Sequence, residues 1–519
     1  MDKLENTQEK KNKIVRSAAQ TAVLMAILTL GSKCLGFVRE MVMANYFGTS
    51  YVVDAYVMAQ SIPEIVFAGV FGSIATSFMP LFSNRIEKEG EKSGNVFTSQ
   101  IILILLIFSL ISAIIGIIFS SEITSIFAKG FAGETAKLTT SFLRITFSYV
   151  IFTSIAGILE AYIQYKNVFI PQILIGYTQS TIVIITIVFS AFTSAYYLIF
   201  GLLLAYFVRM ILLWRLARKN GYKYEQTLKN VKPLLKEILT MAIPVFLGNS
   251  VYQINLFVDK YLASELQEGS VAALNYANIL NTMIMALTVS ILTTIIYPRL
   301  AQANALDDTN RASRLIQSGV NLIIIIALPF SLGAIIYSEQ IVQIIFERGA
   351  FDRFATSLTG SAYMFYSVGM VFMALNSFLT RVYYAVHDMK TPVISASVSV
   401  IINIGLNIML VGKMQHNGLA LATSVVAILN TIWLYWGLRI RHNKLYIVES
   451  WEKIIKFILI SVLAVASSYL IYIFIISIIW MPRIIYLGIA VLIAVLIYFA
   501  LLWLFRIEEL NILKAIIKR

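Results

Sequence analysis

Long apolar runs separated by short polar segments make up most of this sequence. Roughly fourteen windows hold about 20 or more mostly apolar residues, enough for a helix to cross about 30 Å of hydrocarbon. Each window is predicted to form one membrane-spanning helix, and an even number of spans places both ends of the chain on the same side. The predicted spans are residues 17–45, 51–82, 96–120, 138–164, 168–191, 194–217, 234–258, 270–298, 314–337, 355–385, 391–411, 416–440, 454–477 and 483–506.

The composition indicates the same class of protein. The chain has 519 residues, of which 59% are hydrophobic and 13% are charged, with a mean hydropathy of +0.81. No soluble globular protein sustains these values over such a length. The sequence therefore predicts an all-α polytopic membrane protein. Residues 1–16 are polar and the run after them is too long for a signal-peptide core, which indicates a retained first helix behind a cytoplasmic tail.

The distribution of basic residues predicts the orientation. If the N-terminus is cytoplasmic, the inside segments hold about 30 of the 41 Lys and Arg residues and the outside loops about 7. The net charge of +14 is thus explained by membrane topology, and because no basic domain is present we do not expect a nucleic-acid partner. The most basic loop, between Arg215 and Lys236, reads as a linker between two halves that contacts anionic lipid.

An internal repeat supports two halves. Several residues recur at an offset near 220, which predicts two six-helix lobes of equal orientation with two extra helices after them. The recurring pairs are Phe37/Phe257, Tyr56/Tyr276, Thr76/Thr294, Pro80/Pro298, Tyr162/Tyr383, Pro171/Pro392 and Trp214/Trp436. The predicted organisation is a cytoplasmic tail (1–16), a first lobe (17–217), a basic linker (218–233), a second lobe (234–440), and two helices with a cytoplasmic C-terminus (441–519).

Duplicated helical lobes are typical of transporters, in which substrate lies between the lobes near the membrane midplane. An enzyme is not expected, because no catalytic constellation can be assembled and the three histidines fall in or beside loops. The sequence contains no P-loop, so ATP is not the direct fuel. The single cysteine, Cys34, forms no intrachain disulfide, and neither a metal site nor a cofactor is predicted.

Charged residues inside the first predicted helices are candidate site residues, because buried charges in a membrane usually face a cavity. Lys33 and Glu40 share one helix face, and Arg39 points about 120° away. One interpretation is a cationic wall for an anionic substrate. The other is a set of internal ion pairs, Lys33 with Glu40 and Arg39 with Asp54.

Further charges lie deeper in the first lobe. Glu64 follows Pro63, which interrupts the helix, so its carboxylate either lines the cavity or satisfies freed backbone through water. Arg144 in the fourth predicted helix is another interior candidate, together with Glu160. Arg209, near the end of the sixth, is expected to extend to the cytoplasmic surface.

The second lobe carries amides where the first carries charges. Such amides either hydrogen-bond helices together or line a polar lumen that could hold a cation. The candidates are Asn249, Gln253, Asn275, Asn278, Asn403 and Asn407.

Four motifs resemble the MurJ family, the lipid II flippases of the multidrug/oligosaccharidyl-lipid/polysaccharide exporter superfamily. The resemblance covers essentially the whole chain, including the number of spans. The motifs are SKCLGFVREMVMANYFG (32–48) followed by DAY (54–56), YSVGM (366–370), HDMKTP (387–392) and HNGLALATS (416–424).

The resemblance implies a two-lobed flippase that moves undecaprenyl-diphosphate-linked disaccharide-pentapeptide, lipid II, to the outer leaflet for peptidoglycan synthesis. The family's first-helix basic residues match Lys33 and Arg39, which would engage the diphosphate, and its acidic residues match Glu40 and Asp54. The last two helices resemble those that form a groove for the lipid tail. The implied setting is a bacterial plasma membrane, with membrane lipids and cell-wall synthesis proteins as candidate partners and coupling to sodium, protons or membrane potential.

Two positions depart from the family pattern. Many members carry an arginine a few residues after the proline of the second helix, where this chain has Glu64, Ile65, Val66 and Phe67. Many carry another in the eighth helix, where it has Asn278 and Ile279. Some members bind sodium with second-lobe oxygens that include a carboxylate, whereas Asn403 and Asn407 offer neutral oxygens. The alternatives are a flippase for another polyprenyl-linked saccharide of capsule, teichoic or O-antigen type, a drug/cation antiporter, or a scaffold for wall-synthesis enzymes.

Overall fold

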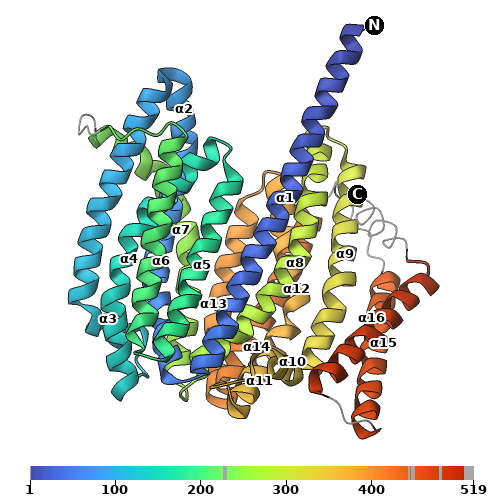
Figure 1. The fold of residues 1–519 in the computed structure, drawn as a ribbon. Helices are drawn as coiled ribbons and strands as arrows, with labels where there is room; N and C mark the ends of the chain where they lie inside the picture. Colours follow the sequence, from blue (N-terminus) through green and yellow to red (C-terminus); the bar gives the residue numbers. More distant parts are fainter. Residues whose placement is uncertain (1, 226–230, 442–444, 446–450, 479–481, 508–519) are drawn as a thin grey trace. The chain divides into compact units, whose positions relative to one another are not determined.

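The computed structural model describes residues 2–225, 231–441, 445, 451–478 and 482–507, and every regular element within them is a helix (Figure 1). The helices divide between two compact units, Met1–Gln253 (unit 1) and Ile254–Arg519 (unit 2), with the boundary inside α7. The first seven are α1 (Asp2–Phe47), α2 (Tyr51–Ile118), α3 (Ser120–Phe127), α4 (Gly133–Tyr165), α5 (Phe169–Ala191), α6 (Tyr196–Lys219) and α7 (Val231–Ser264). The next nine are α8 (Ser270–Ala305), α9 (Thr309–Ile336), α10 (Ser338–Phe346), α11 (Arg353–Val368), α12 (Met370–Ala385), α13 (Lys390–Met414), α14 (His416–Arg441), α15 (Trp451–Ile478) and α16 (Arg483–Leu504).

The all-α, multi-span class is confirmed. Among the described residues, ten helices are long and apolar enough to cross a membrane, or up to eleven if the bent pair α11 and α12 is one span. In this number α2 counts as one helix, although its 68 residues contain two predicted spans. The two spans are joined across Gly90, which has a φ of 84°. The predicted spans 17–45 and 270–298 lie on α1 and α8, where some side chains are outside the described part. The total of fourteen spans and the predicted lobe boundaries stay predictions.

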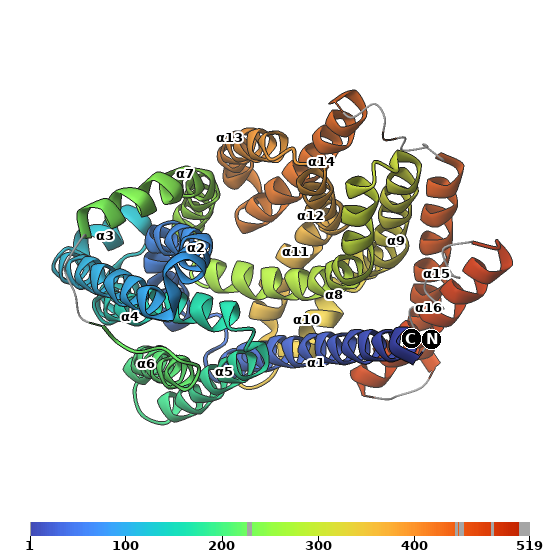
Figure 2. The ribbon, with the colours of Figure 1, turned by 90° about the horizontal axis from the view of Figure 1, so that it is seen from above.

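Unit 1 is built around α2 and α4. These two helices pack along most of their length, α6 packs on α4, and α5 lies between α6 and α1 (Figure 2). Buried aromatic rings fill the interface, where Phe78 stacks on Phe82 and Phe97, and Phe82 contacts Tyr162. Arg85 covers the Phe97 ring at 4.7 Å from its centroid. The rings bury a large apolar area and thereby fix the end of α2 that precedes Gly90.

The beginning of the predicted linker packs on unit 1. Tyr222 is 2% exposed, and its hydroxyl lies 3.1 Å from Ser99 Oγ of α2, while Asn95 Nδ2 donates to the Gly221 carbonyl at 3.1 Å. Burial raises the pKa of the Tyr222 phenol, and the hydrogen bond with Ser99 opposes that rise. Residues 226–230 of the linker lie outside the described residues.

Unit 2 repeats this helix order with two additions. α8 packs on α9, α11 and α12, and α14 packs on α11, α12 and α13. α15 and α16 lie side by side at one edge of the unit, with α15 against α9 (Figure 2). The core includes the buried side chains of Tyr383, Phe457 and Leu438.

Left-handed turns recur at matching places in the two units, as the sequence repeat requires. The pairs Gly48/Gly269, Gly90/Asp307 and Asn167/His387 all have positive φ and lie about 220 residues apart. The short helices α3 and α10, which the hydropathy pattern did not predict as separate elements, also occupy equivalent places. Each begins where a predicted span ends, so the chain forms a short helix before it turns back into the unit.

The predicted span 355–385 is broken in the structure. α11 and α12 meet at Gly369 with a bend of 47°. Ser424 of α14 provides hydrogen-bond partners for the backbone at this break: its Oγ donates to the Phe365 carbonyl at 2.6 Å and accepts from the Gly369 amide at 3.1 Å. A Cβ on Gly369 would lie 2.6 Å from the Ser424 Cα, so only glycine fits there. Two of the sequence motifs, YSVGM and HNGLALATS, therefore meet at this contact.

Candidate functional site

Arg39 of α1 is paired with its neighbour in sequence. Its Nε and Nη2 lie 3.0 and 2.6 Å from Glu40 Oε1, and the two side chains are 28% and 14% exposed. Glu40 is therefore bound to Arg39 rather than to Lys33, the partner that the ion-pair interpretation assigned to it. Lys33 is exposed and forms no ion pair with any described residue. Asp54 is 1% exposed and lies in the first turn of α2, where the helix dipole favours a carboxylate.

The expectation that Pro63 interrupts its helix is wrong, because α2 continues through this residue and α4 supplies a partner for the backbone carbonyl that proline leaves free. Pro63 has no N–H to offer the Ala59 carbonyl four residues earlier, and Thr146 Oγ1 donates to that carbonyl at 3.0 Å. The Tyr149 hydroxyl donates to the next carbonyl, that of Gln60, at 2.9 Å. The freed Ala59 carbonyl thus has a hydroxyl partner without Glu64. The Glu64 side chain is exposed and close enough to Tyr149 for its charge to act on the phenol.

Arg209 of α6 points into unit 1. The prediction that its side chain extends to the cytoplasmic surface is therefore wrong. Its Nη2 lies 2.5 Å from Glu160 Oε1 of α4, its Nε lies 3.0 Å from the same oxygen, and its Nη1 donates to Gln179 Oε1 of α5 at 2.8 Å. One guanidinium therefore joins three helices. Such bidentate contacts are the geometry at which Arg excels over Lys.

Tyr206 of α6 lies among these charges. Its ring stacks on that of Tyr149 with centroids 4.6 Å apart, and the charges of Arg39, Glu64 and Arg209 all act on its phenol. We name Arg39, Glu40, Glu64, Glu160 and Arg209 the first-unit charge cluster. It contains two cations and three carboxylates, so an anionic ligand must compete with the carboxylates for Arg39 and Arg209.

Arg144 lies on α4 beside α3. Its Nε donates to Ser120 Oγ at 3.0 Å, and it lines a polar pocket formed by α3, the turn after it and the start of α4. The prediction that grouped Arg144 with Lys33 and Arg39 in one cavity stays a prediction.

Unit 2 brings Asn403 and Asn407 together with a carboxylate that the sequence analysis missed. Asn407 Nδ2 donates to Asp259 Oδ1 at 2.6 Å and to Asn403 Oδ1 at 2.8 Å, and Asn255 Nδ2 donates to Asp259 Oδ2 at 3.2 Å. The side-chain oxygens of Asn255 and Asn407 are buried and have no hydrogen-bond partner among the described residues. Buried carbonyl and carboxylate oxygens in this number are the ligands that a hard cation prefers.

The internal repeat contains the signal for Asp259. Phe37-Val38-Arg39-Glu40 corresponds to Phe257-Val258-Asp259-Lys260, so Asp259 occupies the position of Arg39 with the opposite charge. The predicted repeat includes Phe257 and Val258, and the reversal of charge directly after them is the signal that points to Asp259.

The other amides are spread more widely. Asn275 is half-buried and Asn278 is exposed on α8, and no hydrogen bond among the described residues joins either to Asp259. On the part of α7 within unit 1, Asn249 is exposed and the buried Oε1 of Gln253 has no described hydrogen-bond partner. Within the part of the chain that the structure describes, Asn403 and Asn407 are the only two of the predicted amides that are hydrogen-bonded to each other.

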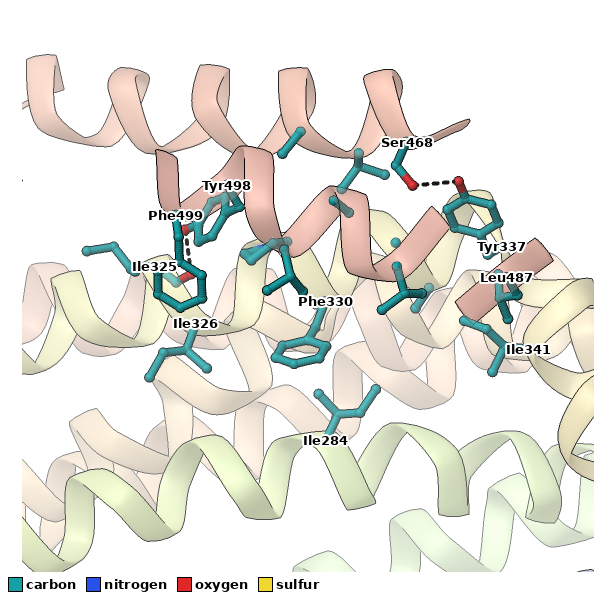
Figure 3. Close-up of a pocket in the computed structure, with 18 of the residues that line it drawn as sticks. Ile284, Ile325, Ile326, Phe330, Tyr337, Ile341, Ser468, Leu487, Tyr498 and Phe499 are labelled. Atoms are coloured by element: carbon teal, nitrogen blue, oxygen red, sulfur yellow. Dashed lines mark hydrogen bonds between the residues drawn. The ribbon is translucent and has the colours of Figure 1, made fainter. Parts of the chain in front are cut away.

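An apolar cavity of about 400 Å³ lies between α15, α16 and the helices beside them (Figure 3). Ile325, Phe330, Leu487 and Phe499 are among its lining side chains. Three of the polar side chains at its wall are already hydrogen-bonded: the Tyr337 hydroxyl lies 2.9 Å from Ser468 Oγ, and the Tyr498 hydroxyl donates to the Ile325 carbonyl at 2.6 Å. The cavity therefore suits an aliphatic chain and offers nothing to a charged group.

The chain matches a known family and several of its relatives. The family model described as "Lipid II flippase MurJ" matches residues 43–499. A "Probable lipid II flippase MurJ" of Rhizobium meliloti is 27% identical over 419 residues, which cover 78% of each chain. A "Lipid II flippase MurJ" of Burkholderia cenocepacia is 27% identical over 425 residues, which cover 80% of this chain and 82% of the relative.

Solved structures agree with this match. A structure titled "Lipid II flippase MurJ, inward closed conformation" superposes with a TM-score of 0.81 and 25% identity, covering 94% of this chain and 100% of the other. An inward-facing multidrug transporter of the MATE family superposes with a TM-score of 0.64 at 14% identity, covering 82% of this chain and 100% of that one, and so shares the fold.

Proposed function

The chain belongs to the MurJ family of lipid II flippases, and from this premise we propose that it carries lipid II from the inner to the outer leaflet of the bacterial plasma membrane by alternating access. The family match over residues 43–499 is the observation that carries this proposal. Membership of a transporter family also means that the chain is not an enzyme. The cargo combines an undecaprenyl tail with a diphosphate and a saccharide, so it requires both a polar and an apolar path.

The proposed topology places both termini in the cytoplasm, with lobes at 17–217 and 234–440 joined by the linker 218–233. The excess of Lys and Arg in the segments that would then face the cytoplasm supports it. Membrane lipids surround the lobes in this arrangement, and the linker approaches the anionic inner surface, where proteins of cell-wall synthesis would also meet the chain.

The proposed headgroup contacts are Lys33 and Arg39. Lys33 is exposed and has no described ion pair, so it can meet a phosphate without giving up a partner. Arg39 is already bound to Glu40, and a diphosphate carries more negative charge than that one carboxylate, so it can displace Glu40 from the guanidinium. Arg209 is held more firmly by Glu160 and Gln179, and its proposed role is to position α4, α5 and α6.

The proposed coupling site is the group Asp259, Asn403, Asn407 and Asn255 in unit 2. Its buried oxygens without described partners support a cation there, and an Asp carboxylate supplies the charge that the neutral amides lack. A sodium ion held by these residues would neutralise Asp259 and draw α7 and α13 together. Protons or membrane potential are the alternatives to sodium.

The proposed tail site is the apolar cavity beside α15 and α16. An undecaprenyl chain gains free energy wherever its methylene and methyl groups leave water or fill apolar space. The cavity wall is almost entirely hydrocarbon, which supports this assignment. The headgroup would move between the lobes while the tail stays in lipid and in this cavity.

Reconstitution in liposomes tests the function. Purified protein is placed in vesicles that contain lipid II or a second undecaprenyl-linked saccharide, and access of each headgroup to an impermeant reagent is followed with and without an imposed potential. Wild type is expected to move lipid II. Lys33→Ala and Arg39→Ala are each expected to slow movement roughly tenfold or more, because a charge-assisted contact contributes about 1.5–3 kcal/mol.

Lys413→Ala is the matched control, since it removes a similar charge from an exposed residue at the end of α13. It should leave the rate unchanged. Movement of the second saccharide lipid alone would replace lipid II as the cargo. The segment after Pro63, which lacks the arginine that many members carry there, would then be the first to examine. Full rates in Lys33→Ala and Arg39→Ala would exclude the headgroup assignment.

A further inference from the structure

A polar pocket of about 760 Å³ opens at the end of unit 1 formed by α3 and the start of α4. We propose that this pocket binds the phosphate of a lipid at the membrane surface, separately from the transport path. Its basic side chains are Lys129, Lys137 and Arg144, and its single acidic one is Glu134. Hydroxyls of Ser121, Thr124 and Ser141 complete much of the polar wall. The lining therefore carries a net positive charge and suits an anion.

The guanidinium of Arg144 is positioned to bind such an anion. Its Nε donates to Ser120 Oγ at 3.0 Å, and Ser120 is fully buried, which fixes the guanidinium against α3. The terminal nitrogens of Arg144 form no hydrogen bond or ion pair with any residue that the structure describes. Two parallel N–H groups on a fixed guanidinium match two oxygens of a phosphate.

The carboxylate in the pocket does little to cancel these charges. Glu134 pairs with Lys137 at 3.1 Å, but both side chains are 76% exposed, and a pair so exposed contributes little. Lys129 is exposed on the turn after α3 and belongs to none of the ion pairs among described residues. Lys129 and Arg144 thus remain available to a ligand.

The surroundings of the pocket indicate a lipid rather than a soluble anion. Ile118, Phe119 and Ile126, at the end of α2 and on α3, are 63%, 51% and 57% exposed, next to the polar face of α3 that lines the pocket. A helix with one apolar exposed face and one polar face lies in the interface of a bilayer. The basic side chains are therefore at the depth of lipid phosphates, on the side that the proposed topology places outside.

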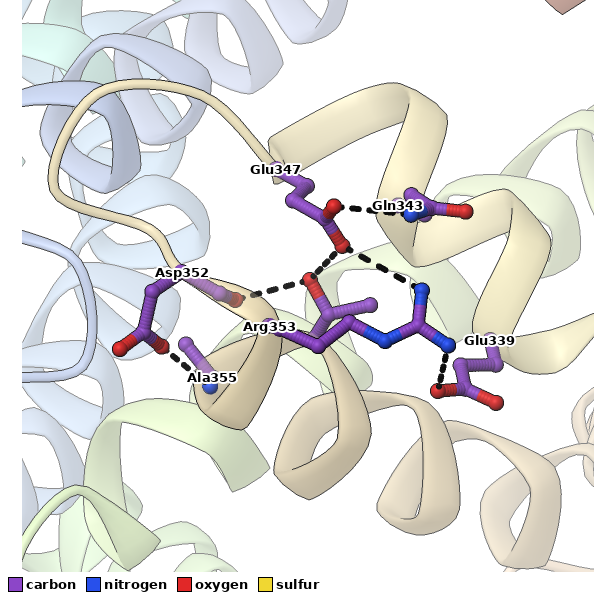
Figure 4. Close-up of polar contacts among 7 residues, drawn as sticks. Glu339, Gln343, Glu347, Asp352, Arg353 and Ala355 are labelled. Carbon is purple, nitrogen blue, oxygen red and sulfur yellow. Dashed lines mark hydrogen bonds and ion pairs between the residues drawn. The ribbon is translucent and has the colours of Figure 1, made fainter. Parts of the chain in front are cut away.

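The equivalent place in unit 2 is different. There Arg353, after α10, is bound by two carboxylates, Glu339 at 3.1 Å and Glu347 at 3.9 Å (Figure 4). Glu347 also accepts hydrogen bonds from Gln343 and Thr356, so the polar groups of this cluster bind one another. In unit 2 the cation Arg353 is thus paired with carboxylates, whereas Arg144 of unit 1 has no carboxylate partner among the described residues.

Native mass spectrometry of the full-length protein tests the proposal. The protein is titrated with phosphatidylglycerol, with lipid II or with inorganic phosphate, and the bound copies are counted. At about fivefold per lost charge near a membrane surface, Lys129→Gln combined with Arg144→Gln should weaken phosphatidylglycerol binding roughly 25-fold. Binding of phosphatidylglycerol is the expected result. Tight binding of lipid II alone would overturn the proposal, because it would place the pocket on the transport path.

Arg348→Gln is the control, because Arg348-Gly349 corresponds to Lys129-Gly130 in the repeat and is likewise exposed. It should change binding less than twofold. Lys129→Gln alone alters an exposed turn and keeps the fold, and it should still lose about fivefold. The proposal would be overturned if phosphatidylglycerol binding is unchanged in Lys129→Gln and in the double variant, or if Arg348→Gln loses as much binding. It would also be overturned if inorganic phosphate binds as tightly as either lipid.

Discussion

A reversal of charge between equivalent residues is the clearest feature at the scale of single residues. Arg39 on α1 and Asp259 on α7 occupy the same place in the repeat, and each is bound by polar side chains. The sequence predicted Arg39 because a charge in an apolar run is conspicuous. Asp259 was missed because it lies just past the predicted span 234–258, where a charge is unremarkable. Only the fold brings it to Asn403 and Asn407, which follow it by well over a hundred residues.

Asp259→Asn should abolish stabilisation by sodium. A cation that binds the folded state raises the unfolding temperature as its concentration exceeds its dissociation constant. Asn keeps the shape of Asp and removes the charge, so the fold should survive while the cation affinity falls. The measurement compares thermal unfolding of purified protein in sodium and in potassium chloride.

Asn278→Ala serves as the control, because Asn278 is exposed on α8 and no described hydrogen bond joins it to Asp259. It should respond to sodium as wild type does. Equal stabilisation of Asp259→Asn and wild type would remove this residue from any sodium site. A wild type indifferent to sodium would leave protons or membrane potential as the driving force.

At the scale of elements, hydropathy predicted the spans but not their interruptions. Every predicted span except 355–385 falls on one helix, since about 20 apolar residues in lipid have few alternatives to a helix, and 355–385 divides between α11 and α12. The break at Gly369 and the short helices α3 and α10 were not predicted. None of them changes the average hydropathy of a window of about 20 residues, from which the spans were predicted. The break depends on a hydroxyl from α14 that replaces a hydrogen bond within the helix.

Gly369→Ala should destabilise the protein by about 1–3 kcal/mol, because its Cβ would meet the backbone of α14 at Ser424. Gly405→Ala on α13 is a matched substitution, since a Cβ there meets nothing within 4 Å. It should be neutral or stabilise by up to about 1 kcal/mol. Thermal unfolding in detergent compares the two. Equal effects would mean that the contact between Gly369 and Ser424 does not hold the break.

At the scale of the whole molecule, the repeat accounts for what sequence could predict and for what it could not. The constant offset predicted two similar units, and the recurring left-handed turns follow from it. The repeat could not show how each unit uses its charges. Arg39 binds its own neighbour in sequence, and Arg144 lies in a pocket formed by the adjacent helices α3 and α4. Arg209 instead joins α4, α5 and α6, through residues that precede it by 49 and 30 positions, and only the packing of these helices brings them together.

The apolar cavity beside α15 and α16 is the feature that the repeat lacks, and filling it tests what the two extra helices do. Gly333 of α9 lines the cavity, and a Cβ there meets nothing within 4 Å. Gly333→Leu should therefore fold normally and occupy space that an undecaprenyl chain would use, slowing the transport of lipid II several-fold in liposomes.

A lipid II analogue with a short tail separates this effect from general damage, because it does not need the cavity and should move at the wild-type rate in Gly333→Leu. Gly488→Leu is the matched control on α16, where the glycine is exposed and a Cβ also meets nothing within 4 Å. It adds the same side chain outside the cavity lining and should leave both substrates unaffected. Equal slowing of long and short tails would mean that the cavity does not hold the tail, and the extra helices would then need a different role.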